Sequence, residues 1–186
     1  TYNGSMVDAL SGTGTLSGLI SGETLTLGNT ANGTLANANA GSQAVSTALT
    51  LADGTGLASN YVLTQPTLTN VTISKAALTV SSTDVTKTYD GTLGMTGATG
   101  NVATVTSGTL YTNASNGNTA DTLSGGTFAY TNANAGTNTK TVTTTGVTVN
   151  DGNSGGNYAV SYADNTHSTI NPAALTVSTT DVTKTY

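Results

Sequence analysis

The stretch that decides the fold is AALTVSSTDVTKTY, which occupies residues 76–89. It returns as AALTVSTTDVTKTY at residues 173–186, with one difference between the copies. A clipped copy opens the chain, where Thr1-Tyr2-Asn3-Gly4 matches Thr88-Tyr89-Asp90-Gly91. Self-similarity at a long fixed spacing, here from 76 to 173, is typical of an array of repeated units.

The repeat predicts three parts. A β module truncated at its N-terminal strand covers residues 1–74, a complete β module covers 75–171, and the first strand pair of a following module covers 172–186. Only four residues intervene between Ile73 and Leu78, which is too few for a flexible tether. We therefore expect very short linkers that couple successive modules stiffly.

The composition is that of β structure with a polar surface. Hydrophobic residues make up 35% and charged residues 7% of the 186 residues, both below the usual values for globular proteins. Disordered segments are normally charged and poor in β-branched residues. Here Val, Ile, Leu and Thr fall in alternating runs instead, so an ordered chain is expected.

The charge balance excludes several classes of partner. The net charge is −5, and the four basic residues are all isolated lysines. A nucleic-acid surface or a polybasic membrane patch needs clustered cations, so neither partner is expected. No apolar run reaches the ~18 residues that span a bilayer, so no membrane span is expected.

Alternation of apolar residues predicts strands throughout the second module, and no window keeps the apolar spacing of a helix. The clearest strands are Leu78/Val80, Val85/Lys87/Tyr89, Phe128/Tyr130, Val142/Thr144 and Tyr158/Val160/Tyr162. Seven or eight short strands with frequent turns are typical of an antiparallel sandwich. The expected fold class is therefore all-β, with β-grasp-like modules or a strand-exchanged filament as alternatives.

Four motifs occur in a fixed order: Lys87-Thr88-Tyr89-Asp90-Gly91, then Asn132-Ala133-Asn134-Ala135-Gly136, then Gly156-Asn157-Tyr158, then Ile170 to Val177. Together they resemble the YDG/MBG tandem domains of large bacterial surface adhesins, including filamentous-haemagglutinin-like exoproteins. The first copy departs from the pattern, because Asn3 stands where the motif has Asp. The resemblance implies tandem immunoglobulin-like β-sandwich modules in an extracellular stalk or fibre, without enzymatic activity.

The residues expected to matter structurally are those of the motifs: Tyr2, Tyr89, Asp90, Gly91, Asn134, Gly136, Asn157, Tyr158 and Tyr186. A tyrosine buries a large ring while its hydroxyl finds a partner, so the motif tyrosines are expected to lock the opening strand to its neighbour. A platform on which a carbohydrate stacks is the other interpretation. The Asn-Ala-Asn-Ala-Gly motif is expected to form a turn.

Three further residues have both a chemical and a plain structural interpretation. Asp151 lies in a loop rich in side chains whose oxygen atoms could bind a cation, so the loop is either a calcium site or an ordinary turn. Lys87 lies on the same predicted face as Val85 and Tyr89, which allows an intramolecular Lys–Asn isopeptide bond or a lysine whose charged end reaches an edge. His167 is the single histidine, so no catalytic triad, metal cluster or cofactor is expected.

The predicted function is a rigid stalk or filament segment of an extracellular bacterial adhesin or biofilm-matrix fibre. Its expected partners are neighbouring repeats of the same chain and other copies in a filament, since weakly charged strand edges invite pairing. The alternative is a module that binds a glycan or a matrix polysaccharide. The expected location is the bacterial cell surface.

Overall fold

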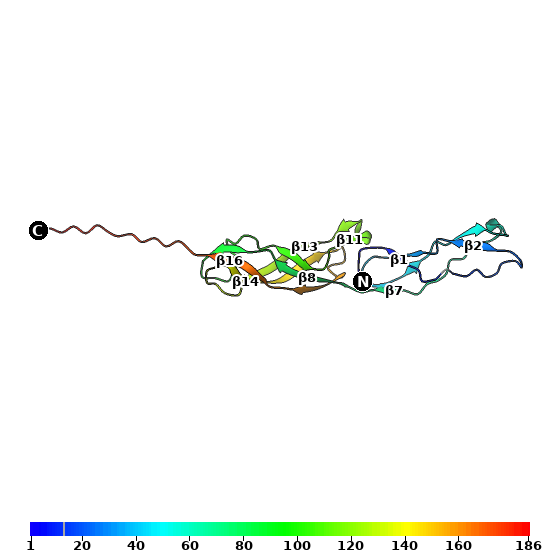
Figure 1. Cartoon of the computed structure of the whole chain (residues 1–186), viewed down its shortest axis with the longest axis horizontal. Helices are drawn as coiled ribbons and strands as arrows, with labels where there is room; N and C mark the ends of the chain where they lie inside the picture. Colours follow the sequence, from blue (N-terminus) through cyan, green and yellow to red (C-terminus); the bar gives the residue numbers. More distant parts are fainter. Residues whose placement is uncertain (13) are drawn as a thin grey trace. The chain divides into compact units, whose positions relative to one another are not determined.

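The computed structural model describes residues 1–12 and 14–186 and is all-β, as predicted (Figure 1). Its two helical segments are single 3₁₀ turns, η1 (Ala58–Asn60) and η2 (Ala114–Asn116). Neither segment has the length or apolar character needed to cross a membrane, and no other helix occurs in the described residues.

Sixteen strands follow one another along the described chain. Those of the first repeat are β1 (Val7–Ala9), β2 (Leu25–Gly28), β3 (Asn32–Leu35), β4 (Gly41–Gln43), β5 (Val45–Ser46), β6 (Thr50–Asp53) and β7 (Val71–Ile73). Those of the second repeat are β8 (Ala76–Ser82), β9 (Thr86–Thr88), β10 (Ala103–Ser107), β11 (Thr112–Asn113), β12 (Thr119–Ala120), β13 (Thr122–Tyr130), β14 (Gly136–Asn150), β15 (Tyr158–Tyr162) and β16 (Asn165–Asn171).

The chain forms two compact units. Unit 1 comprises residues 1–78, 107–123 and 149–160, and unit 2 comprises residues 79–106, 124–148 and 161–186. Unit 1 thus combines the whole first repeat with three segments of the second repeat, residues 75–78, 107–123 and 149–160. The division by sequence into modules at 1–74, 75–171 and 172–186 stays a prediction.

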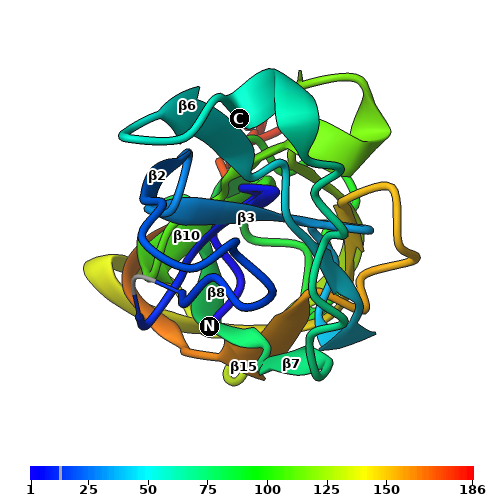
Figure 2. The ribbon, with the colours of Figure 1, turned by 90° about the vertical axis from the view of Figure 1, so that its right-hand side faces the viewer.

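Unit 1 contains several small antiparallel sheets. The strand order of one is β1-β3-β5, while β2 pairs with β6 (Figure 2), β4 with β7 and β11 with β12. Glycine makes some of these strands possible, because a Cβ on Gly33 would lie 2.7 Å from a Val45 methyl group. The short strands and close backbone approaches follow from a sequence rich in Gly and poor in large apolar residues.

Unit 2 contains a four-stranded sheet with the order β13-β14-β16-β9. Strands β14 and β16 are antiparallel, whereas β9 pairs with β16 in parallel, with Ile170 opposite Lys87. A further sheet has the order β10-β8-β15. The parallel pair brings the repeated segment 76–89 against the last strand of its own repeat.

The core of unit 2 is built by four fully buried side chains: Val85, Tyr130, Val142 and Ile170. The Tyr130 hydroxyl lies 2.9 Å from the carbonyl oxygens of both Val85 and Thr169, so the ring is buried and its polar end is satisfied. The Val85 amide donates to Ser168 Oγ at 3.0 Å. Side-chain packing and backbone hydrogen bonds therefore hold the same residue, Val85.

The predicted alternation around β9 is confirmed at two positions and wrong at the third. Val85 is fully buried and Lys87 nearly so, as expected for one face of a strand. Tyr89, however, is 45% exposed. The reason is that β9 ends at Thr88, so Tyr89 lies beyond the sheet, where its amide donates to Asn171 O.

Replacing Ile170 with Ala should lower the free energy of unfolding by about 2–5 kcal/mol, because it opens a cavity in the core of unit 2. Urea denaturation followed by circular dichroism measures the change. The matched control is Ile20→Ala, since Ile20 is 66% exposed and its truncation should cost less than about 0.5 kcal/mol. Equal losses in the two variants would contradict the assigned core.

Candidate functional site

Tyr2 anchors a cluster of three tyrosine rings in unit 1. Its side chain is 1% exposed. Its ring meets those of Tyr111 and Tyr158 edge to face, with centroids 5.7 and 5.3 Å apart. Edge-to-face pairs contribute about 0.5–1.5 kcal/mol each beyond the area that they bury. The opening residues of the first repeat therefore pack against side chains of the second repeat.

The Asp121 carboxylate connects two of these rings. Tyr2 and Tyr158 both donate their hydroxyl hydrogens to Asp121 Oδ2, over 2.8 and 2.6 Å. The other carboxylate oxygen, Oδ1, is buried and has no hydrogen-bond partner among the described residues. Because a buried charge is costly unless it is hydrogen-bonded, the two hydroxyl groups are essential to this carboxylate.

Both tyrosines resist ionisation. Burial, reinforced by the hydrogen bond to Asp121, raises the pKa of the Tyr2 hydroxyl well above its ordinary value. The same two causes raise the pKa of the Tyr158 hydroxyl. A tyrosinate beside this carboxylate would place two negative charges together, so both hydroxyl groups stay protonated donors.

Gly4 lets the two repeats approach each other closely. Its φ of +76° lies in the left-handed region, and a Cβ at this position would stand 2.0 Å from Thr112 O. The Gly4 carbonyl accepts a hydrogen bond from Ala114 N at 2.9 Å. The glycine of the motif is thus required where the first repeat meets the second.

Three asparagines form a second contact between the repeats, also in unit 1. Asn39 Oδ1 accepts hydrogen bonds from the side-chain amides of Asn113 and Asn157, at 3.0 and 3.1 Å. Asn157 Oδ1 accepts from Ala40 N at 2.9 Å, and Ser115 Oγ accepts from Ala38 N at 2.7 Å. Within the first Asn-Ala-Asn-Ala-Gly motif, Asn39 N donates to Asn37 Oδ1 at 2.8 Å, so the side chain of Asn37 closes a local turn, and the motif docks on the second repeat.

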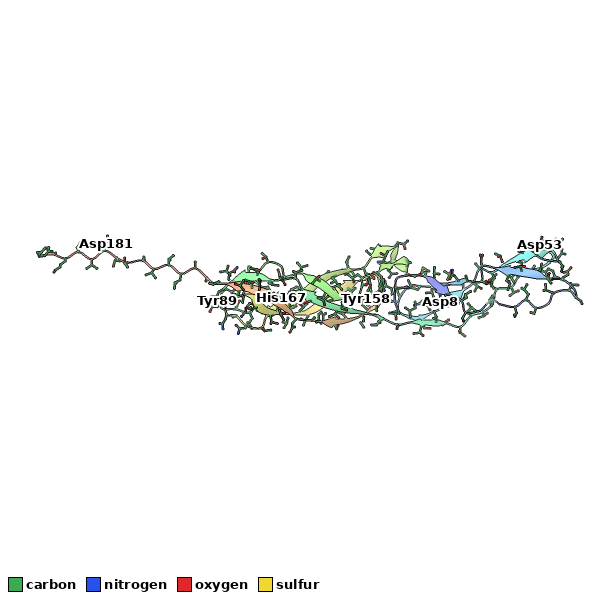
Figure 3. All side chains as sticks on the ribbon, viewed as in Figure 1. Asp8, Asp53, Tyr89, Tyr158, His167 and Asp181 are labelled. Carbon is green, nitrogen blue, oxygen red and sulfur yellow. The ribbon has the colours of Figure 1, made fainter. Side chains whose placement is uncertain are left out.

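Asp151 organises the loop that carries Asn157. Its carboxylate accepts hydrogen bonds from the amides of Asn153, Gly155 and Asn157, at 2.8–2.9 Å. These bonds account for the residue as part of a turn, and the calcium site stays a prediction. Asp53 acts in a similar way in the first repeat, where it accepts from Ala58 N at 2.6 Å (Figure 3).

The second copy of the motif, in unit 2, has different surroundings. Lys87 Nζ is buried and donates to Asp90 Oδ1 at 2.7 Å and to the carbonyl oxygens of Thr92 and Gly94 at 2.8 and 2.9 Å. The hydrogen bond from Lys87 lowers the pKa of the Asp90 carboxyl to about 2. No asparagine is among the hydrogen-bond partners of Lys87 in the described residues. The isopeptide bond stays a prediction.

The remaining predicted residues lie in unit 2, and most of them are exposed. Gly91 keeps a left-handed φ of +77°. Asn134 is exposed, Gly136 begins β14 opposite Ile170, and Tyr186 lies in the extended segment after β16. His167 is exposed on β16 (Figure 3). The motif residues of the two copies are therefore not equivalent, since those of the first copy are joined to a neighbouring repeat.

The contacts of Tyr2, Gly4 and Asn39 with the second repeat form a junction between the two repeats. Sequence reasoning missed the residues of the second repeat that complete this junction. Asp121, Asn113 and Tyr111 belong to none of the four motifs, and their partners are distant in the chain. One signal was available: the chain has only nine acidic residues, so an Asp beside apolar strands was a candidate for a buried role.

A family model described as the YDG domain matches residues 1–69 and 74–167, which together cover most of the chain. The two matched segments correspond to the two sequence repeats. Neither the comparison with curated proteins nor that with solved structures gave a match.

Replacing Tyr2 with Phe should lower the free energy of unfolding by about 1–3 kcal/mol, because it removes one of the two donors to a buried carboxylate. Urea denaturation measures the effect. Tyr89→Phe is the matched control at the same motif position, because Tyr89 is 45% exposed, and the loss of its hydroxyl should cost less than about 0.5 kcal/mol. A Tyr2→Phe variant as stable as the control would contradict a stabilising role for the hydrogen bond between Tyr2 and Asp121.

The junction also predicts alkaline sensitivity. The pKa values of Tyr2 and Tyr158 are higher in the folded chain than the ordinary value of about 10 in an unfolded one. Their stabilising contribution is therefore complete below about pH 10 and is lost as the pH rises further. Urea titrations at a series of pH values above about 10 should show a free energy of unfolding that falls as the pH rises. The fall should be shallower for Tyr2→Phe. A flat profile in the unsubstituted chain would exclude this linkage.

Proposed function

The chain belongs to the YDG domain family, and on that basis we propose that it is a structural segment of an extracellular bacterial adhesin or matrix fibre. Its modules, of the immunoglobulin-like sandwich type, would follow one another as a stiff stalk. In this role the chain transmits force and keeps the parts at its two ends a fixed distance apart. No chemical step is required of it.

The observation that carries this proposal is the buried junction between the repeats. Tyr2 and Asn39 of the first repeat hydrogen-bond to Asp121, Asn113 and Asn157 of the second repeat. A flexible string of domains would have exposed, loosely contacting ends. Side chains that are almost fully buried between consecutive repeats favour a rod.

The covalent connection between the repeats is short. Strand β7 ends at Ile73 and β8 begins at Ala76, whose amide donates to Asn157 O at 2.9 Å. Tyr2 N donates to Ser74 O at 2.7 Å, in the same connection. Backbone hydrogen bonds on both sides of the link limit its bending.

The extracellular location rests on composition and on the family. The chain is free of cysteine, poor in lysine, and rich in Thr, Asn and Gly. This composition is common among proteins that bacteria export, and it suits strands whose surfaces hydrogen-bond to water.

Glycan binding remains the second proposal, because two motif tyrosines, Tyr89 and Tyr186, are exposed. Tyr89 is 45% exposed, and a sugar ring can stack on an exposed aromatic face. Binding of a polysaccharide that is lost in Tyr89→Ala would support this role.

The stiff-stalk proposal predicts that the two repeats tumble as one body in solution. Nitrogen-15 relaxation of the full chain should give the same rotational correlation time for residues 1–74 and 75–171. Tyr2→Ala should separate the two values by loosening the junction, whereas Tyr89→Ala should leave them equal. Different correlation times in the unsubstituted chain would contradict the proposal.

A further inference from the structure

Asparagine is followed by glycine at three places in the chain: Asn3-Gly4, Asn32-Gly33 and Asn116-Gly117. In such a pair the backbone nitrogen of the glycine can attack the side-chain carbonyl carbon of the asparagine. Glycine favours this attack, because it has no side chain to shield its nitrogen and its backbone rotates freely. The three pairs are equivalent in sequence, and the structure makes them different. All three lie in unit 1.

The first pair is held by the junction between the repeats. Gly4 is buried, and a Cβ at this position would stand 2.0 Å from Thr112 O. The carbonyl oxygen of Gly4 accepts a hydrogen bond from Ala114 N at 2.9 Å. The carboxamide of Asn3 is held as well, since its Oδ1 accepts from Ser5 N at 3.0 Å. The backbone of Gly4 therefore cannot rotate towards Asn3 unless the first repeat leaves the second.

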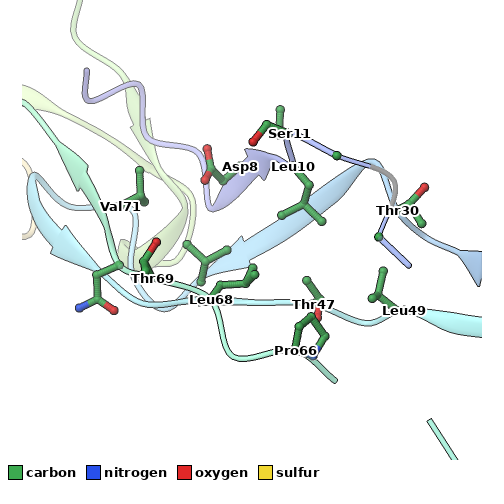
Figure 4. Close-up of a pocket in the computed structure, with 15 residues that line it drawn as sticks. Asp8, Leu10, Ser11, Thr30, Thr47, Leu49, Pro66, Leu68, Thr69 and Val71 are labelled. Carbon is green, nitrogen blue, oxygen red and sulfur yellow. The ribbon is translucent and has the colours of Figure 1, made fainter. Parts of the chain in front are cut away.

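The second pair is held inside a sheet. Asn32 and Gly33 begin β3, which pairs with β1 and β5. Gly33 is buried, and a Cβ there would lie 2.7 Å from a Val45 methyl group and 3.2 Å from a Leu10 methyl group. Both of these side chains line the pocket drawn in Figure 4, where Leu10 is labelled. Rotation of the Gly33 backbone would separate the paired strands.

The third pair is open. Asn116 is the last residue of η2, and Asn116, Gly117 and Asn118 are all exposed. Among the described residues, apart from its chain neighbours, no atom lies within 4 Å of the place that a Cβ on Gly117 would take. A single 3₁₀ turn has poor hydrogen-bond geometry, and an exposed turn opens without unfolding the rest of a domain. Only this pair can rearrange while the two repeats stay folded.

We propose that Asn116 is a site of spontaneous deamidation, at which the folded chain reacts in preference to Asn3 and Asn32. Hydroxide takes the proton from the backbone nitrogen of Gly117, which then attacks Asn116 Cγ. The bond from Cγ to Nδ2 breaks, the leaving nitrogen takes a proton from water, and ammonia departs from a succinimide ring. Water opens the ring at one of its carbonyl groups and leaves either Asp or isoaspartate, whose backbone runs through the former side chain.

The site lies next to residues that hold the repeats together. Ala114 N donates to Gly4 O at 2.9 Å, and Ser115 Oγ accepts from Ala38 N at 2.7 Å. Asn113 Oδ1 accepts from Ser115 N and thereby caps the same turn. Isoaspartate lengthens the backbone of this turn by one carbon atom. The contacts of the turn with the first repeat must then shift.

Both products also bring a negative charge to the loop of Asp151. A Cβ on Gly152 would lie 2.6 Å from Asn116 Cγ, so the Asn116 side chain lies directly on this loop. The Asp151 carboxylate is fully buried and is held by three backbone amides. A new carboxylate beside it adds repulsion between like charges. Deamidation therefore weakens the junction, and this inference holds whether or not the chain serves as a stalk.

Incubation of the folded full chain in mildly alkaline water enriched in oxygen-18 tests the site. The heavy oxygen marks the residues that react during the incubation, as opposed to those that react during the later digestion. Mass spectrometry of the peptides should show several-fold more conversion at Asn116 than at Asn3 or Asn32. The matched control is the same incubation in concentrated urea, where the three asparagines should react at similar rates.

Similar rates at the three asparagines of the folded chain would overturn the proposal. So would a preference for Asn116 that persists unchanged in urea, because the local sequence and not the fold would then select the site. Asn116→Gln should remove the fast reaction and leave the slow conversion of Asn3 and Asn32 as it was. A fast reaction that survives in Asn116→Gln would place the site elsewhere.

The effect on the junction is measured on two further samples. Nitrogen-15 relaxation should give different rotational correlation times for residues 1–74 and 75–171 in the converted chain and, to a smaller extent, in Asn116→Asp. Asn116→Gln is the control and should keep the two values equal. Equal values in the fully converted chain would overturn the effect of deamidation on the junction. The stalk itself is judged on the unconverted chain, so the two failures are distinguishable.

Discussion

The Asp121 carboxylate is the constraint on which the junction depends. It lies in the protein interior and is held by the hydroxyl groups of Tyr2 and Tyr158. Removing a carboxylate from water costs several kcal/mol unless donors replace the water, so the two tyrosines cannot move away independently. Their rings in turn fix Tyr111, and the approach of Gly4 to Thr112 follows from the same arrangement. One acidic side chain thereby organises contacts from four segments of the chain.

The motif around Tyr89 combines two separable tasks. Within unit 2, Lys87 and Asp90 close a loop by an ion pair at 2.7 Å, and this task needs no neighbouring repeat. The tyrosine and the glycine serve the second task, as Tyr2 and Gly4 show where they meet the second repeat in unit 1. The substitution of Asn3 for the acidic residue affects the first task only. Its side-chain oxygen still forms the same turn.

Much of the strand pattern could be predicted from sequence, because alternation is a local property. Leu78, Val80, Val85 and Lys87 are buried as their spacing indicates, and the first Asn-Ala-Asn-Ala-Gly motif is a turn. The exposure of Tyr89 could not be predicted, since it depends on where β9 ends relative to Asn171. The role of Asp121 was equally hidden, because its partners are 37 and 119 residues away. Local patterns identify strands, whereas junctions depend on long-range contacts.

The distance in sequence between Tyr2 and Asp121 also has a consequence for folding. A contact between residues that far apart forms late, because the chain must first close a long loop. Tyr158 lies further along still, so the first repeat cannot complete its packing until most of the second has been synthesised. Until then the ring of Tyr2 and the strand edges of unit 1 stay accessible. Maturation of the first repeat is thus timed by the synthesis of the second.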